Sequence, residues 1–297
     1  MPQLNVLKEK LKKMKRKKHP ILDHTILSYF LLALFFTFIS FFTSIIDTGI
    51  AFILPGYGTV IEMMGRKVTT AKGVGDVVAA LLSLFIFSKW FSGEYKGVLK
   101  KKGLGLGLLM FLPFLIFHYT GSIVSIMTVG SSNILIALLR AAAPGFGEEV
   151  TFRGMGVANY MRKVKDEKGI MFIFWLSSIV FGLIHITNVF SGADTTASVI
   201  QVFYAMGVGM LLCAVYLRTG NLWPSILAHW SVDFLEMIRK DLSNGIMHGM
   251  IIGDWITIAA GLFAAVLALI LMSKKHRPEI LQIWNDKWAV TTEIVNQ

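Results

Sequence analysis

Three short motifs in the middle of the chain hold side chains that can do acid–base chemistry on water. Their residues, in chain order, are Glu148, Glu149 and Arg153; Phe181 and His185; and His229 and Asp233. A glutamate in an environment that favours its neutral form can act as a general base toward water. Histidines can stabilise a developing oxyanion, or hold a metal ion that does so. Together the motifs predict a site that activates water.

The first motif separates the roles of its two glutamates. Residues four apart on a helix share a face, so Glu149 and Arg153 are expected to form an internal ion pair that supports the structure. Glu148 is rotated by about 100° from Glu149 and is left to face a site. A purely structural salt-bridge cluster is the alternative that this motif alone leaves open.

The two histidine motifs have similar alternatives. His185 is either a catalytic group or an interface residue with a satisfied hydrogen bond. Asp233 lies four residues after His229, from where it can orient the imidazole or join it at a metal. Zinc commonly takes three protein ligands and keeps a fourth position open. The candidate ligands of one divalent metal such as zinc are Glu148, His185, His229 and Asp233; the HExxH pattern of common zinc peptidases is absent from the sequence.

The composition places these motifs in a membrane protein. Of 297 residues, 55% are hydrophobic and 16% are charged, whereas a soluble chain is about a quarter charged. The apolar residues form blocks of about 20, the length that crosses a bilayer as a helix. This pattern excludes a secreted disulfide scaffold, a disordered chain and a nucleic-acid-binding domain. Cys213 is the only cysteine, which excludes an internal disulfide and a cysteine-cluster metal site.

Eight segments are candidates for membrane spans. Five are clear apolar runs: 26–46, 103–127, 169–188, 197–217 and 251–272. Three are shorter or more polar: 76–91, 132–155 and 223–238. We therefore predict an all-α polytopic membrane protein, a bundle of about eight transmembrane helices. Its expected domains are a basic segment over 1–25, the bundle over 26–272, and a cytoplasmic amphipathic tail over 273–297.

Positive charge predicts the orientation, because Lys and Arg favour cytoplasmic loops. With eight spans and the N-terminus inside, the inside segments hold 22 Lys and Arg residues and the outside loops hold 5. We therefore expect a multi-pass protein of the cell membrane with both termini in the cytoplasm, and topology explains most of the net charge of +11. The basic run 8–19 either retains the first span or binds anionic lipid. The tail segment 280–288 is expected to lie on the membrane surface.

The depth of the motifs in the membrane poses a difficulty. An ionised side chain near the centre of a bilayer costs about 2.5–3.5 kcal/mol, so the charged residues must be paired, protonated or in contact with a wet cavity. Counting along the spans places Glu148 in the inner half and His185 near the outer face. For these two to meet, the fourth helix must start deeper or break at Pro144 and Gly145, or the fifth must begin at the surface. Asp47, next to the first span, is expected to be solvated.

The three motifs resemble those of the CPBP intramembrane protease family, also called the CAAX-protease or Abi family. That family has EExxxR, FxxxH and HxxxN/D in this order, and the chain has GEEVTFRG, FGLIH and TGNLWPSILAH followed by Asp233. The resemblance covers about residues 130–240. It implies an eight-helix intramembrane peptidase whose eukaryotic relatives remove the last three residues of prenylated CAAX proteins.

The resemblance also implies roles for the residues. Glu148 would activate the water with His185 beside it, while His229 and Asp233 would stabilise the oxyanion or complete a metal site. Arg153 with Glu149 would hold the geometry of the helix. Some members have asparagine where this chain has Asp233; asparagine can donate a hydrogen bond, and ionised aspartate cannot. Asp233 must therefore be protonated, orient the neighbouring histidine, or ligate a metal.

We expect an intramembrane endopeptidase that acts on a peptide or a membrane protein and requires the lipid bilayer. The basic composition indicates a bacterial plasma membrane, where prenylated substrates are not expected; bacterial members are associated with bacteriocin maturation or self-immunity. One alternative is a proton-coupled transporter, since intramembrane acids also relay protons, although the chain shows no inverted repeat. The other alternative is a non-catalytic peptide-binding or immunity protein.

Overall fold

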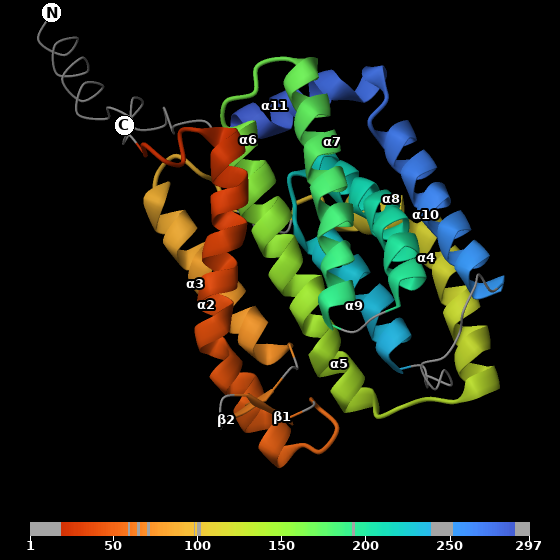
Figure 1. The fold of residues 1–297 in the computed structure, drawn as a ribbon. Coiled ribbons are helices and arrows are strands. Elements are labelled where there is room, and N and C mark those ends of the chain that lie inside the picture. The colour runs from red at the N-terminus through yellow and green to blue at the C-terminus, as the bar shows by residue number, and fades with distance from the viewer. Residues whose placement is uncertain are drawn as a thin grey trace, which may run out of the picture.

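The computed structural model describes residues 19–58, 60–63, 66–69, 72–97, 99, 102–191, 194–238 and 252–288. These residues form a helical bundle with one β-hairpin at its edge (Figure 1). Nearly all of the basic run 8–19, the loop 239–251 and the end of the tail, 289–297, lie outside the described residues. What was predicted for these segments stays a prediction.

Each predicted span corresponds to a helix or to a continuous run of helices. In chain order they are α2 (Thr25–Ile53), α3 (Val74–Trp90), α4 (Leu104–Val129), α5 (Ile134–Ala142) with η1 (Ala143–Val157) and α6 (Ala158–Met161), α7 (Glu167–Ile184) with η2 (His185–Ser191), α8 (Thr195–Thr219), α9 (Trp223–Ile238) and α10 (Ile252–Leu271). A short turn, η3 (Lys274–His276), leads into α11 (Arg277–Trp288). The hairpin of β1 (Val60–Met63) and β2 (Arg66–Thr69) is antiparallel, and Val60 pairs with Thr69. Among the described elements this hairpin is the one that is not helical, and it was not predicted.

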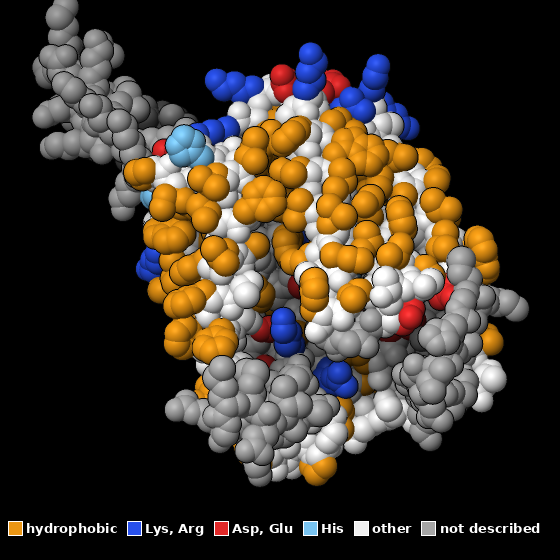
Figure 2. Space-filling model, in the orientation of Figure 1, with side chains coloured by type: hydrophobic (Ala, Val, Ile, Leu, Met, Phe, Trp, Pro, Cys, Tyr) orange, Lys and Arg blue, Asp and Glu red, His pale blue; other side chains and the backbone are white. Residues whose placement is uncertain are grey.

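Within the part of the chain that the structure describes, five helices are long and apolar enough to cross a membrane. They are α2, α4, α7 extended by η2, α8 and α10, and they coincide with the five clear apolar runs of the sequence. Large hydrophobic side chains cover the sides of the bundle, while Lys and Arg side chains gather at the end that carries α11 (Figure 2). The prediction of an all-α polytopic membrane bundle is confirmed.

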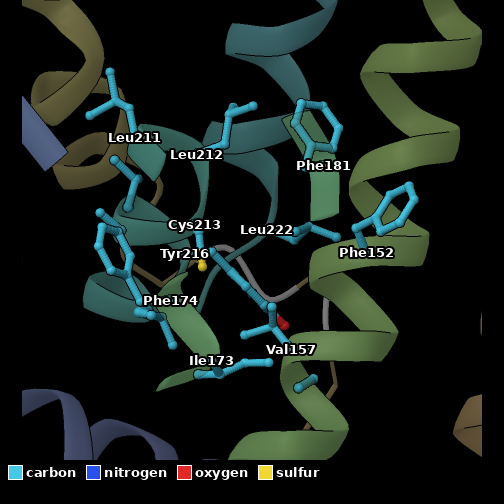
Figure 3. Close-up of a cluster of buried hydrophobic side chains, with 14 of the residues drawn as sticks. Phe152, Val157, Ile173, Phe174, Phe181, Leu211, Leu212, Cys213, Tyr216 and Leu222 are labelled. Atoms are coloured by element: carbon cyan, nitrogen blue, oxygen red, sulfur yellow. The ribbon is translucent and has the colours of Figure 1, made fainter. Parts of the chain in front are cut away.

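Helix α8 forms the centre of the bundle. Within its most apolar window 72% of the residues are buried, against 17–39% for the other candidate spans. Its residues Leu211 and Cys213 belong to one buried cluster with side chains of η1 and α7, such as Phe152 and Phe174 (Figure 3). A side chain at Gly207 would overlap the backbone of α10, so these two helices touch backbone to backbone. Gly207 of α8 thus permits close helix packing.

Helix α11 closes one end of the bundle. Its indole groups donate hydrogen bonds to the ends of two other elements, Trp284 to the Leu217 carbonyl at 3.0 Å and Trp288 to the Ala158 carbonyl at 2.9 Å. The Lys287 ammonium donates to the Gly97 carbonyl at 2.8 Å. The buried face of this segment therefore contacts protein, and its position at the membrane surface stays a prediction.

The expectation that Asp47 is solvated is wrong. Helix α2 continues to Ile53, so Asp47 lies inside it and is only 2% exposed. Its carboxylate accepts hydrogen bonds from the Tyr57 hydroxyl at 2.5 Å and from the Gly75 amide at 3.2 Å. Apolar length alone ended the predicted span too early, because the next turns of the helix are packed against the α2–α3 connection.

Candidate active site

The first motif lies on η1, a helix wider than an α-helix. At its end the Ala158 amide donates to the Arg153 carbonyl five residues earlier, which is the hydrogen bond of a π-helix. The widening begins next to Pro144, whose missing N–H removes one bond of the regular α pattern. The helix therefore does not break at Pro144 and Gly145, as one of our alternatives required, but changes its winding there. Widened turns of this kind are frequent at functional sites.

Gly145 sets the distance between η1 and α9. A Cβ atom at this position would lie 2.5 Å from both Cα and Cβ of Trp230, closer than non-bonded carbons can approach. The absence of a side chain therefore lets α9 lie directly on η1. This contact holds His229, the residue before Trp230, against the first motif.

Glu149 joins the first motif to the third. Its Oε1 atom accepts a hydrogen bond from Arg153 Nη1 at 2.7 Å and another from His229 Nδ1 at 3.0 Å. Glu149 and Arg153 are both fully buried, so the expected ion pair is present. The contact with His229 was not predicted, because it joins residues 80 positions apart. Glu149 thus holds the imidazole as well as the arginine.

The second nitrogen of His229 faces Asp233. The Nε2 atom lies 3.5 Å from Asp233 Oδ2, an ion-pair distance slightly longer than a good hydrogen bond. Since neither an unprotonated nitrogen nor a carboxylate can donate, one proton must lie between the two groups. Of the three roles left open for Asp233, this geometry supports that of orienting His229.

His185 occupies the end of α7, where the helix passes into η2. Its Nδ1 atom lies 2.8 Å from the Phe181 carbonyl oxygen. A carbonyl only accepts, so a hydrogen bond here requires a proton on Nδ1, and the neutral ring then has its lone pair on Nε2. This side chain is half-buried. His185 therefore presents a hydrogen-bond acceptor to its surroundings.

Phe181 brings the three motifs together. Its ring lies 5.2 Å from the ring of His185 and 5.8 Å from that of His229, measured between centroids. The Arg153 guanidinium lies over the same ring at 3.9 Å, and Figure 3 shows Phe181 and Phe152 facing each other. The fourth helical run extends to Met161, beyond the predicted span, and Arg153 of its motif lies level with the last turn of α7. A meeting of Glu148 with His185 stays a prediction.

Glu148 is the glutamate that these contacts leave unused. Its Oε2 atom is buried and has no hydrogen-bond partner among the described residues. Glu148 interacts electrostatically with His229 and Asp233, and also with Asp76 of α3. Asp76 is only 8% exposed and accepts a hydrogen bond from the Ser40 hydroxyl. Asp76 was not among the predicted site residues. Its position, as an acidic residue at the start of an apolar span, could have indicated it.

The predicted metal ligands do not form a ligand set in this arrangement. Within the described ranges, no three His, Cys, Asp or Glu side chains are grouped so that they could hold a metal ion. His229, one of the four candidates, has both ring nitrogens turned toward carboxylates. In this arrangement the four side chains do not fit a divalent metal.

Comparison with known proteins bears on the same segment. Residues 130–235 match the family model described as type II CAAX prenyl endopeptidase Rce1-like. This segment is an Rce1-like domain of the CPBP family. The match contains all three motifs, so the resemblance drawn from the residues is confirmed. No significant match was found among curated proteins or among solved structures.

The family assignment carries a general function. The Rce1-like family is a family of proteases, and the apolar helices make this chain a multi-pass membrane protein. It is a CAAX-protease-like intramembrane endopeptidase in this general sense. The match covers the fourth helical run to most of α9, whereas α2, α3 and α10 lie outside it.

Proposed function

We propose that the Rce1-like domain hydrolyses peptide bonds at the level of the membrane, with Glu148 as general base. One observation carries this proposal. Both adjacent glutamates have a buried Oε2 atom without a partner among the described residues, but the Oε1 atom of Glu149 is bonded to Arg153 and His229. Glu148 has no such bond, and it interacts electrostatically with the same histidine. Its carboxylate can accept a proton from water, a step typically worth about 10²–10⁴-fold in rate.

The surrounding side chains support a defined sequence of bond changes. A water molecule would donate hydrogen bonds to Glu148 and to Nε2 of His185. Its oxygen attacks the carbonyl carbon, the π electrons move to the carbonyl oxygen, and Glu148 takes the proton. His229, held by Glu149, stabilises the resulting negative charge. The C–N bond then breaks while the proton passes from Glu148 to the leaving amine.

We propose a peptide or a membrane protein as the substrate, and a bacteriocin precursor is one such substrate. The surface between α2 and α7 is hollowed, and charged side chains lie in the hollow within an otherwise hydrophobic band (Figure 2). An apolar substrate segment could reach the site from the bilayer through this opening. We further propose that the enzyme lies in the cell membrane with both termini cytoplasmic, as the distribution of Lys and Arg supports.

The test compares membrane peptidomes of cells that produce the wild type or the Glu148→Gln variant. Peptides that depend on Glu148 name the substrate, and their absence from the variant supports the role of general base. Glu279→Gln in α11 is the matched control, because its side chain is 55% exposed and remote from the motifs. If wild type and Glu148→Gln give the same peptides, the peptidase proposal is wrong. Substrate-independent proton flux in liposomes would instead favour transport.

A further inference from the structure

Tyr204 of α8 has a buried hydroxyl group that the motifs do not explain. Among the described tyrosines it is the one whose hydroxyl oxygen is buried without a hydrogen-bond partner. Other tyrosine hydroxyls are bonded: Tyr29 to Ser177, Tyr57 to Asp47, Tyr95 to Tyr216, and Tyr119 to Ser231. Burying a hydroxyl without a partner destabilises a protein, so such a group needs a reason.

The hydroxyl lies beside the third motif. Tyr204 interacts electrostatically with Asp233 and with Glu236, both on α9. Glu236 in turn accepts a hydrogen bond from the Ser122 hydroxyl of α4 at 3.3 Å. The buried Tyr204 hydroxyl is therefore within electrostatic range of Asp233, the carboxylate that faces His229.

The proposed reaction needs hydrogen-bond donors for the oxyanion, and the three motifs contain few that are free to donate. A tetrahedral oxyanion is commonly held by two hydrogen-bond donors. His229 can offer the oxyanion only its Nε2 side, because its Nδ1 proton is committed to Glu149, so a second donor must come from elsewhere. The N–H of His185 is committed to the Phe181 carbonyl. An ionised Asp233 cannot donate, whereas the asparagine of some relatives can.

We propose that the Tyr204 hydroxyl is a further catalytic group, which donates a hydrogen bond to the oxyanion on the Asp233 side of the site. This inference rests on the proposed peptidase function. The hydroxyl keeps its proton throughout, and it stabilises the oxygen only while that oxygen carries the negative charge. In the transition state the substrate oxygen accepts the hydrogen bond for which this hydroxyl otherwise has no acceptor.

The experiment compares Tyr204→Phe with Tyr216→Phe. Both substitutions remove a buried hydroxyl from α8, but that of Tyr216 is 3.3 Å from its partner Tyr95 and far from the motifs along the helix. Each purified variant in proteoliposomes is given a mixture of internally quenched fluorescent peptides. Turnover is then measured on the peptide that the wild type cleaves fastest. Thermal unfolding in detergent is measured on the same preparations.

We expect Tyr204→Phe to lower kcat on the order of 10²-fold, as loss of one oxyanion donor does, with little change in KM. Its unfolding temperature should equal or exceed that of the wild type, because an unsatisfied hydroxyl has been removed. Tyr216→Phe should keep its turnover and unfold at a lower temperature. In an Asp233→Asn background the effect of Tyr204→Phe should shrink to less than about 10-fold, since the amide supplies a donor.

Two kinds of result would overturn the inference. If Tyr204→Phe keeps kcat within about 3-fold while Glu148→Gln is inactive, the peptidase function stands and Tyr204 has no catalytic role. A loss of unfolding temperature as large as that of Tyr216→Phe would make its hydroxyl structural. If wild type and Glu148→Gln cleave the mixture equally or not at all, the proposed function itself fails, and the role of Tyr204 fails with it.

Discussion

The buried ion pair of Glu149 with Arg153 is expected to contribute far more to stability than an exposed ion pair at the same distance. Glu149 and Arg153 lie 2.7 Å apart and both side chains are 0% exposed. In Glu149→Gln the guanidinium would stay buried without its carboxylate, and breaking a buried pair in this way costs about 3–5 kcal/mol. The same substitution also weakens the hold on His229.

The chain offers a matched control for this variant. Arg218 and Glu279 also lie 2.7 Å apart, but the Glu279 side chain is 55% exposed. A pair with an exposed carboxylate is close to the surface pairs that contribute about 0–1 kcal/mol, because water screens it. The freed Arg218 side chain is 9% exposed, against 0% for Arg153. Glu279→Gln therefore changes the same atoms at the same distance and differs from Glu149→Gln in burial.

The assay is thermal unfolding in one detergent, followed by tryptophan fluorescence. One kcal/mol shifts the midpoint of a chain of this size by about 2–4 °C, so Glu149→Gln should lower it by about 6–20 °C and Glu279→Gln by less than about 4 °C. The double variant Glu149→Gln with Arg153→Met should recover much of the loss, because it leaves no charge unpaired. Equal shifts for the two single variants would refute the argument that burial decides the contribution.

Three further predictions concern packing, pH and metal content. Gly145→Ala should lower peptide hydrolysis and stability, by about 1–3 kcal/mol, because its methyl group would press on Trp230, while Gly105→Ala meets nothing within 4 Å and should not. Burial acts to raise the pKa of Asp23, but the hydrogen bonds from Arg162 and the His19 amide, with the charges of Arg162 and Lys163, together lower that pKa below its usual value. Wild type should therefore lose stability relative to Asp23→Asn as the pH falls below about 4, measured as unfolding midpoints. Active protein purified without chelator should hold less than one zinc per chain by elemental analysis.

Each of these predictions has a result that would contradict it. Gly145→Ala and Gly105→Ala with the same turnover would show that the contact with Trp230 does not position the site. Parallel pH curves for wild type and Asp23→Asn would show that this carboxylate is not stabilised by its arginine. One metal per active chain, lost in the Glu148, His185 and His229 variants, would mean that the site rearranges around a metal ion.

The amino-acid sequence determined the architecture because membrane insertion depends chiefly on local composition. Apolar blocks of about 20 residues predicted the five clear spans, and the structure has helices at all eight candidate positions. Helical spacing predicted the pair of Glu149 with Arg153, since both partners lie one turn apart on one element. The order of three motifs predicted the family, which needs no knowledge of how the helices pack.

Other features were decided by the packing of helices. The bond between Glu149 and His229 depends on the direct approach of α9 to η1, which a glycine permits. The burial of Asp47 depends on how the α2–α3 connection folds back on α2. Neither the hydropathy nor the spacing of the residues carries information about these contacts, because their partners lie on other elements.

Tyr204 shows the difference most clearly. In the sequence it is one aromatic residue in the apolar run of α8, with no motif around it. In the folded chain its hydroxyl lies buried beside Asp233 without a hydrogen-bond partner among the described residues. The sequence by itself determined which elements enter the membrane and which motifs they carry. Only the tertiary structure decided which polar groups are satisfied, because hydrogen-bond partners are set by the distances between helices.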